Sequence, residues 1–263
     1  MSAERTNVVL GAGSGMGAAV AARLVGRGPL LLADRDGDRV AEVAAGLGSD
    51  VRSMACDVTE QADVDALVAA TGRLGALVLT AGLSPSMASG RPIWAVNLFG
   101  TDRVLRACEP ILGAGSVALC FSSMSAHMLP PSAEVEAILD DPASPSFLDD
   151  LAAMGLDPDD PRISYALSKL AVLRLVRHRA KAWGAAGARL LSLSPGIIDT
   201  GMGRLEATNE PAMAQMVEAS ALAREGRPEE LAAVAAFLVS DEASFMTGTD
   251  VLVDGGAIAA LQG

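Results

Sequence analysis

Asn7-Val-Val-Leu-Gly-Ala-Gly-Ser-Gly-Met-Gly17 is the stretch that decides the fold of this chain. Its apolar start predicts a short strand, its glycines predict a tight turn, and the Ala/Val/Leu pattern that follows predicts a helix to Leu24. Glycines let a backbone approach a pyrophosphate closely, and the free amide groups at a helix start attract negative charge. Strand, glycine loop and helix in this order therefore indicate a dinucleotide-binding unit.

The alternation of strand and helix continues along the rest of the chain. Further strands are expected at 30–33, 51–55, 76–79, 116–121, 189–194 and 250–253, and helices near 38–46, 61–71, 93–112, 165–184 and 229–239. Such alternation predicts a parallel sheet with helices on both faces. We expect one large α/β domain over 1–263, because 51% of the 263 residues are hydrophobic and can form a sizeable core.

The composition argues against several classes of protein. No apolar run approaches the ~20 residues of a membrane span, so a soluble, cytoplasmic protein is expected. A net charge of −12 argues against nucleic acid binding, which needs clustered Lys and Arg. Cys56, Cys108 and Cys120 share no metal-ligand spacing. We expect them to be reduced core thiols, and we expect no metal site.

Two carboxylates follow the second and third predicted strands. Asp34 can accept hydrogen bonds from both adenosine ribose hydroxyls, and its charge would repel a 2′-phosphate, so NAD is expected over NADP. The neighbouring Arg35 leaves that preference open. Asp57 either accepts from the adenine amino group or caps the next helix. The glycines also fit a second register, Gly-x-Gly-x-x-Ala from Gly13, and methyltransferases carry similar loops.

Tyr165 and Lys169 lie four residues apart on a predicted helix, which places the phenol and the ammonium on one face. A cation beside a phenol favours the phenolate and lowers the phenol's pKa. The pair therefore predicts a proton-transfer device. The same spacing also occurs between unrelated surface residues, so this interpretation depends on the rest of the chain.

The motifs taken together resemble those of the short-chain dehydrogenase/reductase family over essentially the whole chain. They occur in that family's order: Gly11-x-x-x-Gly15-x-Gly17, Asp34, Cys56-Asp-Val58, Ala81-Gly82, Val96-Asn-Leu98, Phe121-Ser-Ser123, Tyr165-x-x-x-Lys169, Pro195-Gly-Ile-Ile-Asp-Thr200, Gly226-Arg-Pro-Glu-Glu230 and Asp254-Gly-Gly256. The resemblance implies a single doubly wound (Rossmann) domain around a seven-stranded parallel sheet. It also implies reversible hydride transfer between a nicotinamide and a carbonyl or secondary alcohol.

The resemblance assigns each chemical role to a residue. Tyr165 is the expected general acid/base, Lys169 would lower its pKa and bind the nicotinamide ribose, and Ser123 would hold the substrate oxygen, with Ser122 as its rival. Asn97 would hold a water chain behind Lys169, or simply kink its helix. The implied cofactor contacts are Gly11, Ser14, Gly15, Met16, Gly17, Asp34, Arg35, Asp57, Val58, Ala81, Gly82, Tyr165, Lys169, Pro195, Ile198 and Thr200.

The chain departs from the family pattern in two places. Thr80 stands where an asparagine usually begins the Asn-Ala-Gly turn, so local hydrogen bonds there must differ. An insertion, residues 128–162, separates Ser123 from Tyr165. With this insertion, the chain most resembles the bacterial 3α-hydroxysteroid dehydrogenase/carbonyl reductase branch of the family.

Residues 128–162 are expected to form a helical lid over an apolar pocket. Ser132 and Ser146 can each cap a short helix, and the apolar faces of both helices need something to cover. A plain surface excursion packed on the body is the alternative. Flexible methionines could line the pocket: Met87, Met124, Met202, Met213 and Met216. The expected substrate is a bulky neutral alcohol or ketone, such as a steroid or terpenoid, because the acidic rim repels anions.

Other functions and assemblies stay open at this point. A nucleotide-sugar epimerase or dehydratase shares Tyr-x-x-x-Lys, but such proteins usually add a carboxy-terminal domain, and this chain stops soon after its last predicted strand. A non-catalytic NAD-sensing protein would not need the four catalytic residues. His127 lies near Ser123, but no acid partner is identifiable and a catalytic role is not expected. A homodimer through 250–253 is expected, with a homotetramer as alternative, because cations and the insertion hinder pairing through the Tyr165 helix.

Overall fold

The computed structural model describes residues 4–128, 130–209 and 212–262, and its strands form one parallel sheet. The strand order is β3-β2-β1-β4-β5-β6-β7, and every neighbouring pair is parallel. The strands are β1 (Thr6–Leu10), β2 (Leu30–Asp34), β3 (Val51–Ala55), β4 (Leu74–Leu79), β5 (Val117–Phe121), β6 (Arg189–Pro195) and β7 (Asp250–Val253). Every predicted strand is confirmed to within about two residues.

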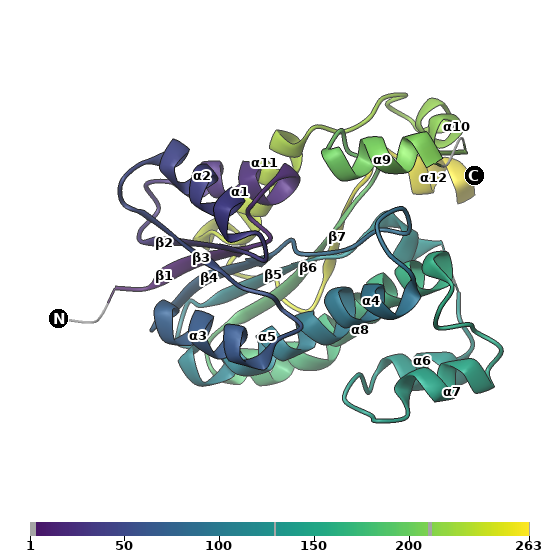
Figure 1. Ribbon diagram of the computed structural model, residues 1–263, viewed down its shortest axis with the longest axis horizontal. Coiled ribbons are helices and arrows are strands. Elements are labelled where there is room, and N and C mark those ends of the chain that lie inside the picture. The colour runs from purple at the N-terminus through teal and green to yellow at the C-terminus, as the bar shows by residue number, and fades with distance from the viewer. Residues whose placement is uncertain (1–3, 129, 210–211, 263) are drawn as a thin grey trace.

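Helices cover both faces of the sheet (Figure 1). One face carries α1 (Gly15–Leu24), α2 (Gly37–Leu47) and α11 (Pro228–Leu238), and the other carries α3 (Gln61–Thr71), α4 (Gly90–Trp94), α5 (Thr101–Cys108) and α8 (Pro161–Ala185). Short helices complete the chain: α6 (Ala133–Leu139), α7 (Phe147–Ala153), α9 (Gly201–Asn209), α10 (Ala212–Ala219), α12 (Ala257–Gln262), the π-helix η1 (Ala95–Gly100), and the 3-10 helices η2 (Glu109–Ile111), η3 (Met124–His127) and η4 (Asp241–Ala243). The predicted doubly wound fold is therefore confirmed.

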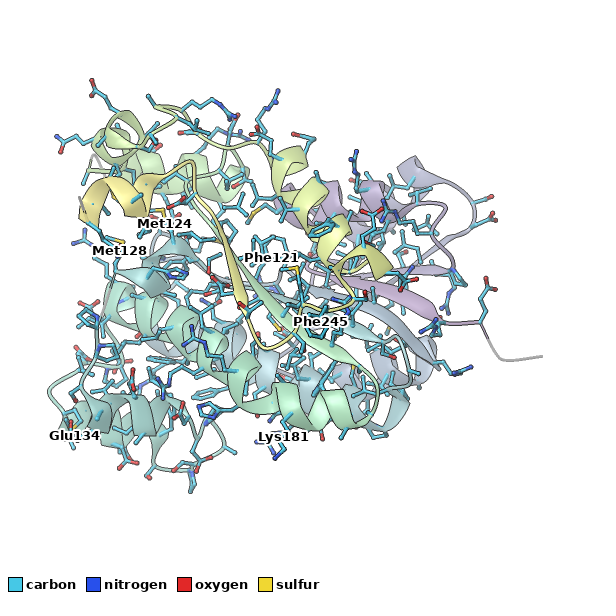
Figure 2. All side chains as sticks on the ribbon, turned by 180° about the vertical axis from the view of Figure 1, so that it is seen from behind. Phe121, Met124, Met128, Glu134, Lys181 and Phe245 are labelled. Carbon is cyan, nitrogen blue, oxygen red and sulfur yellow. The ribbon has the colours of Figure 1, made fainter. Side chains whose placement is uncertain are left out.

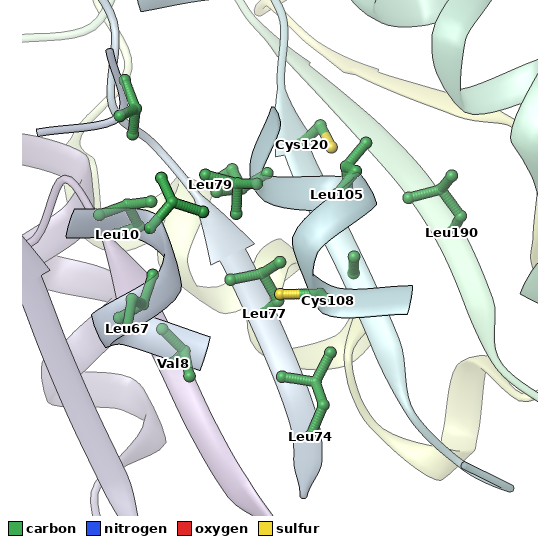
Figure 3. Packing of buried hydrophobic residues seen from close by; sticks show 14 of the residues in the cluster. Val8, Leu10, Leu67, Leu74, Leu77, Leu79, Leu105, Cys108, Cys120 and Leu190 are labelled. Atoms are coloured by element: carbon green, nitrogen blue, oxygen red, sulfur yellow. The ribbon is translucent and has the colours of Figure 1, made fainter. Parts of the chain in front are cut away.

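The sheet is buried on both faces because its strand residues alternate between two apolar layers. Val8 and Leu77 belong to the layer under α3, α5 and α8 (Figure 3), and Val9 and Val78 belong to the layer under α1 and α11. The cysteines Cys56, Cys108 and Cys120 are buried and unpaired, as predicted, and burial raises the pKa of each thiol to about 12. In the described part of the chain, no helix is both long and apolar enough to cross a membrane.

The insertion packs on the outer side of α4 and α8. Phe147 of α7 meets Trp94 of α4 edge-on, with ring centroids 5.3 Å apart, and Val135 and Leu151 are buried in the same cluster. On α8, Arg174 forms two hydrogen bonds to Asp140, one of them 2.7 Å long. Apolar burial and an ion pair thus attach the insertion to the body of the protein.

This position differs from the expected lid. Met128 is the only described residue of 128–162 that lines the cavity beside Tyr165. Figure 2 shows Glu134 of α6 far from Met124 and Met128, which lie beside that cavity. The insertion is therefore a surface excursion packed on the body, the alternative given above. Its apolar side chains pack against Trp94 and its neighbours and do not cover a ligand pocket.

Two details of the expected insertion are also corrected. Ser132 caps α6 by accepting from the Val135 amide, but Ser146 donates to the Asp150 carboxylate and does not cap α7 with its side chain. The apolar face expected on α7 does not extend to Met154, which is 44% exposed. Glu136 and Asp140, which belong to the expected acidic rim, pair with Arg174.

Replacing Phe147 with alanine tests whether the insertion is part of the packed body. Phe147→Ala should lower the free energy of unfolding by about 3–5 kcal/mol, the usual cost of an aromatic cavity in a core. Met154→Ala on the exposed side should change it by less than ~0.5 kcal/mol. Urea denaturation of both variants measures the difference. Equal, small effects would mean that the insertion contributes no packing energy and behaves as a loose segment.

Candidate active site

The glycine loop lies at the carboxyl edge of the sheet, between β1 and α1. A Cβ on Gly17 would come within 2.0 Å of the Gly11 carbonyl oxygen, and one on Gly11 within 2.4 Å of the Ala81 amide nitrogen. Gly15 has φ +54 and begins α1. The register Gly11-x-x-x-Gly15-x-Gly17 therefore has a steric reason at each glycine.

A cleft of about 300 Å³ opens over this loop. The start of α1 borders it, and Ser14 at that helix start makes no side-chain capping bond, so the first amide groups of α1 are available to phosphates. Most of the predicted cofactor contacts line it: Gly11, Ser14, Gly15, Met16, Gly17, Asp34, Arg35, Asp57, Val58, Ala81, Gly82 and Thr200. Strand order reverses between β1 and β4, which is where such folds bind their ligands.

Asp34 ends β2 at the far end of this cleft. Its carboxylate accepts hydrogen bonds from the Gly13 amide at 2.9 Å and the Asp36 amide at 3.0 Å, which hold it over the glycine loop. Arg35 and Arg39 line the same cleft, and Arg39 was not among the predicted contacts. Its position one turn into α2 is the signal that could have found it.

Asp57 does not cap α3, whose N-cap residue is Glu60. One of its carboxylate oxygens accepts from the Thr59 amide at 2.8 Å and from the Thr59 hydroxyl at 2.7 Å. Asp57 lines the cleft all the same. The helix-cap alternative is therefore wrong, and the carboxylate instead orders the turn after β3.

Tyr165, Ser123 and Lys169 converge where β5 ends against α8. The Ser123 side chain is hydrogen-bonded to Tyr165, and its oxygen also accepts from the Ser125 amide at 3.2 Å. Ser122, the rival serine, donates to the Lys169 carbonyl oxygen at 2.8 Å. The two serines thus differ in partner, and Ser123 is the one that meets the phenol.

The electrostatics of the pair differ from the expectation. Burial first, and then the nearby Glu206 charge, raise the pKa of Tyr165 to about 12, while the Ser123 hydrogen bond acts in the opposite direction. Burial lowers the pKa of Lys169 to about 8, while Glu206 acts to raise it. The expected lowering of the Tyr165 pKa by Lys169 is not found, because loss of water around the phenol favours its neutral form.

Lys169 lies beneath the cleft, and its ammonium is held by the protein backbone. Its Nζ donates to the Phe121 carbonyl oxygen at 3.1 Å and lies 5.9 Å from the centre of the Tyr165 ring. The same Nζ would be 3.3 Å from a Cβ on Gly82, a residue that lines the cleft. The ammonium is therefore close to the cleft floor, where a sugar hydroxyl could reach it.

Asn97 sits in the π-helix η1, so the expected kink is present. Its side-chain oxygen accepts from the Leu83 amide at 2.8 Å, and its amide nitrogen donates to the Leu83 carbonyl at 3.0 Å. Its own carbonyl accepts from the Thr101 hydroxyl at 2.8 Å. Asn97 thus anchors the loop after β4. Thr80, directly after β4, donates its hydroxyl to the Leu10 and Gly11 carbonyls, and these are the local hydrogen bonds that replace those of the usual asparagine.

A second cavity, of about 210 Å³, continues from the cleft, and we call it the substrate cavity. It shares Met16, Thr200 and Met202 with the cleft. Ser123, Tyr165 and the predicted contacts Pro195 and Ile198 lie in its wall. Met87 borders only the nucleotide cleft. The other four of the five predicted methionines line the substrate cavity as expected: Met124, Met202, Met213 and Met216.

Sequence reasoning missed two contacts in this region. His127 does have an acid partner, because its Nε2 lies 2.9 Å from the Asp250 carboxylate and 3.2 Å from the Ser194 hydroxyl. These contacts tie η3 to β6 and β7. Glu206 on α9 lines the substrate cavity, and its spacing of four residues from Met202 is the signal that could have found it.

Comparisons with known proteins agree with this architecture. A family model described as Enoyl-(Acyl carrier protein) reductase matches residues 11–138 and 154–257, so its unmatched middle lies within the insertion. The chain is 30% identical to the 3-alpha-hydroxysteroid dehydrogenase/carbonyl reductase of Comamonas testosteroni, covering 97% of both proteins. It is 31% identical to the D-threitol dehydrogenase of Mycolicibacterium smegmatis, covering 95% of this chain and 91% of that one.

A solved structure with the same fold supports the same family. A short-chain type dehydrogenase/reductase from Mycobacterium ulcerans superposes with a TM-score of 0.77 at 27% identity, covering 97% of this chain and 90% of that one. Sheet order, glycine loop and the Ser123, Tyr165 and Lys169 cluster occur together in one chain that these relatives match almost end to end. The chain therefore belongs to the short-chain dehydrogenase/reductase family and is a nicotinamide-dependent oxidoreductase of alcohol and ketone substrates.

Proposed function

We propose that the protein transfers a hydride reversibly between NAD(H) and a secondary alcohol or ketone with a bulky apolar body, such as a steroid or terpenoid. One observation carries the proposal. The Tyr165 phenol, hydrogen-bonded to Ser123, faces a cavity that continues into the dinucleotide cleft. A group that exchanges a proton with the substrate oxygen and a site for the hydride carrier are thus adjacent.

Proton transfer, substrate binding and cofactor binding are assigned to different residues of the chain. In reduction, the protonated Tyr165 phenol gives its proton to the substrate oxygen, and in oxidation its phenolate accepts that proton. The Ser123 hydroxyl holds the same oxygen and stabilises the charge that develops there. A bound nicotinamide supplies or accepts the hydride. Lys169, held by the Phe121 carbonyl, would bind the sugar next to that ring.

The apolar body of the substrate is inferred from the walls of the substrate cavity. Methionine side chains are flexible and adapt to different apolar shapes. The cavity of about 210 Å³ is below the ~300–1,000 Å³ of pockets that enclose drug-sized ligands, so a steroid or terpenoid requires α9 and α10 to move outward. The related enzymes act on a hydroxysteroid and on D-threitol, so their alcohols span a wide range of size.

NAD is proposed as the cofactor because of Asp34. Its carboxylate is held at the end of β2 by two backbone amides, where it can accept from ribose hydroxyls and repel a 2′-phosphate. Arg35 and Arg39 border the same cleft and attract phosphate, so they oppose this preference. The Asp34 carboxylate is hydrogen-bonded to the glycine loop through the Gly13 amide, whereas Arg35 and Arg39 are exposed, and this difference favours NAD.

A homodimer through β7 and α11 is proposed as the assembly. Phe245 beside β7 is fully exposed (Figure 2), and Phe237 of α11 and Leu252 of β7 are also partly exposed. The opposite side, over α4 and α8, is covered by the insertion. Two of the cations expected to repel a partner there are paired within the chain, Arg174 with Asp140 and Arg179 with Asp102, so the insertion is the larger obstacle to pairing on that side.

Replacing Asp34 tests the cofactor proposal. The unaltered protein should use NAD with higher kcat/KM than NADP, and Asp34→Ala should narrow that gap. Loss of two hydrogen bonds to a charged group should raise KM for NAD roughly ten- to a hundredfold. Asp38→Ala, which removes the same charge from an exposed site of α2, serves as the control. Equal efficiency with both cofactors in the unaltered protein would contradict the proposal.

Replacing Tyr165 tests the proton-transfer role. Tyr165→Phe should lower kcat by ~10²–10⁴-fold, while NADH still binds as judged by fluorescence titration. Lys169→Ala should weaken both turnover and NADH binding. Ser123→Ala should lower kcat far more than Ser122→Ala, because only Ser123 meets the phenol. A Tyr165→Phe enzyme that retains more than about a tenth of the rate would rule out this mechanism.

The assembly is tested by charging the exposed aromatic residue. Light scattering should give the mass of a dimer for the unaltered protein and of a monomer for Phe245→Glu, since a buried, unpaired charge opposes association. Met154→Glu, at an exposed position on the insertion, should remain a dimer. A tetramer, or a dimer that Phe245→Glu leaves intact, would show that another surface joins the subunits.

A further inference from the structure

Glu206 occupies an unusual place on α9. Met202 and Glu206 are four residues apart, so both face the substrate cavity, and both line it. Leu205, next to Glu206, is instead 43% exposed. Hydrophobic burial would favour the opposite arrangement, with the leucine inside and the carboxylate in water. Hydrophobic burial therefore does not explain why this half-buried carboxylate faces the cavity.

Glu206 shares its cavity with uncharged side chains. Among the described residues that line the substrate cavity, Glu206 carries the only charged side chain, and the rest of the lining is Met and Ile together with Ser, Thr, Tyr, Pro and Gly. Arg204, on the same helix, forms an ion pair with Asp199 at exposed positions outside that lining. Charges interact more strongly where water is partly excluded, so this carboxylate dominates the electrostatics of the cavity.

Glu206 also lies close to the reacting groups. Its charge raises the pKa of Tyr165 and that of Lys169, both on α8. The hydroxyl of Ser123, which would hold the substrate oxygen, lines the same cavity. A substrate bound through its oxygen at Ser123 and Tyr165 therefore has Glu206 within the space that its remaining part must occupy.

We propose that Glu206 is a specificity-determining residue that selects alcohols and ketones whose apolar body carries a second, hydrogen-bond-donating group, an ammonium or a hydroxyl. The carboxylate accepts from that group, while the methionines cover the body between it and the reacting carbon. A carboxylate substrate is rejected by like charge, and a wholly apolar substrate gains no hydrogen bond from Glu206. This inference rests on the proposed function and adds a polar requirement to its substrate.

The test uses matched cyclohexanols whose ring carbon opposite the hydroxyl carries a methyl, hydroxyl, ammonium or carboxylate group. With NAD, the unaltered protein should give the highest kcat/KM for the ammonium and hydroxyl compounds and the lowest for the carboxylate. Glu206→Gln should lower kcat/KM for the ammonium compound roughly ten- to a hundredfold, as expected for losing a hydrogen bond between charged groups. Glu206→Gln should leave kcat/KM for the methyl compound nearly unchanged and raise kcat/KM for the carboxylate compound.

Glu218→Gln is the matched control. Glu218 is an exposed residue of α10 outside the cavity lining, and its substitution removes the same charge. An equal effect of Glu206→Gln on all four compounds, or the same pattern from Glu218→Gln, would overturn the inference and leave the proposed function standing. Calorimetric binding of the ammonium compound further distinguishes failure of this inference from failure of the proposed function. Glu206-dependent binding without hydride transfer to any of the alcohols would overturn the proposed function instead.

The pH dependence of oxidation gives a second readout. Oxidation needs the Tyr165 phenolate, so its rate rises with pH below the pKa of the phenol. Glu206 raises that pKa, and the titratable groups around the phenol are Glu206 on α9 and Lys169 on α8. Glu206→Gln should therefore shift the profile for the methyl compound to lower pH, and Glu218→Gln should not. An unshifted profile in Glu206→Gln would mean that the carboxylate does not act on the cavity.

Discussion

The close approach of backbone to backbone at the glycine loop is the constraint on which the rest of the structure depends. Gly17 packs against the Gly11 carbonyl, and Gly11 packs against Ala81 at the end of β4, with no room for a Cβ at either glycine. This contact brings β1, α1 and β4 together where the strand order reverses. The nucleotide cleft, the carboxylate of Asp34 and the loop held by Asn97 all take their positions from that junction.

Burial decides the chemistry of the reacting groups as much as their neighbours do. Tyr165 and Lys169 both lose water at the junction of β5 and α8, and each is shifted toward its neutral form. Glu206 opposes this effect at Lys169 and strengthens it at Tyr165. The site is therefore suited to keeping a proton on the phenol, and a cation brought into the cavity or cleft would shift that balance toward the phenolate.

The insertion changes which surfaces of the fold remain available. Its helices place Phe147 against Trp94 and Asp140 against Arg174, and so cover the outer side of α4 and α8. The substrate cavity is enclosed by other segments, chiefly α9, α10 and the strand ends, so the insertion and the reaction occupy different sides of the molecule. An added segment can thus alter the outer surface of this fold without touching its chemistry.

The sequence by itself determined the strands, the glycine loop and the Tyr165 and Lys169 spacing, because each rests on a local period or on the steric freedom of glycine. The tertiary structure decided the rest. An amphipathic helix packs its apolar face on an apolar partner, but its sequence does not specify that partner. In this protein the helices of the insertion pack on Trp94. His127 and Asp250 meet across the fold, and the direction of the Tyr165 pKa depends on burial, which only the packed chain defines.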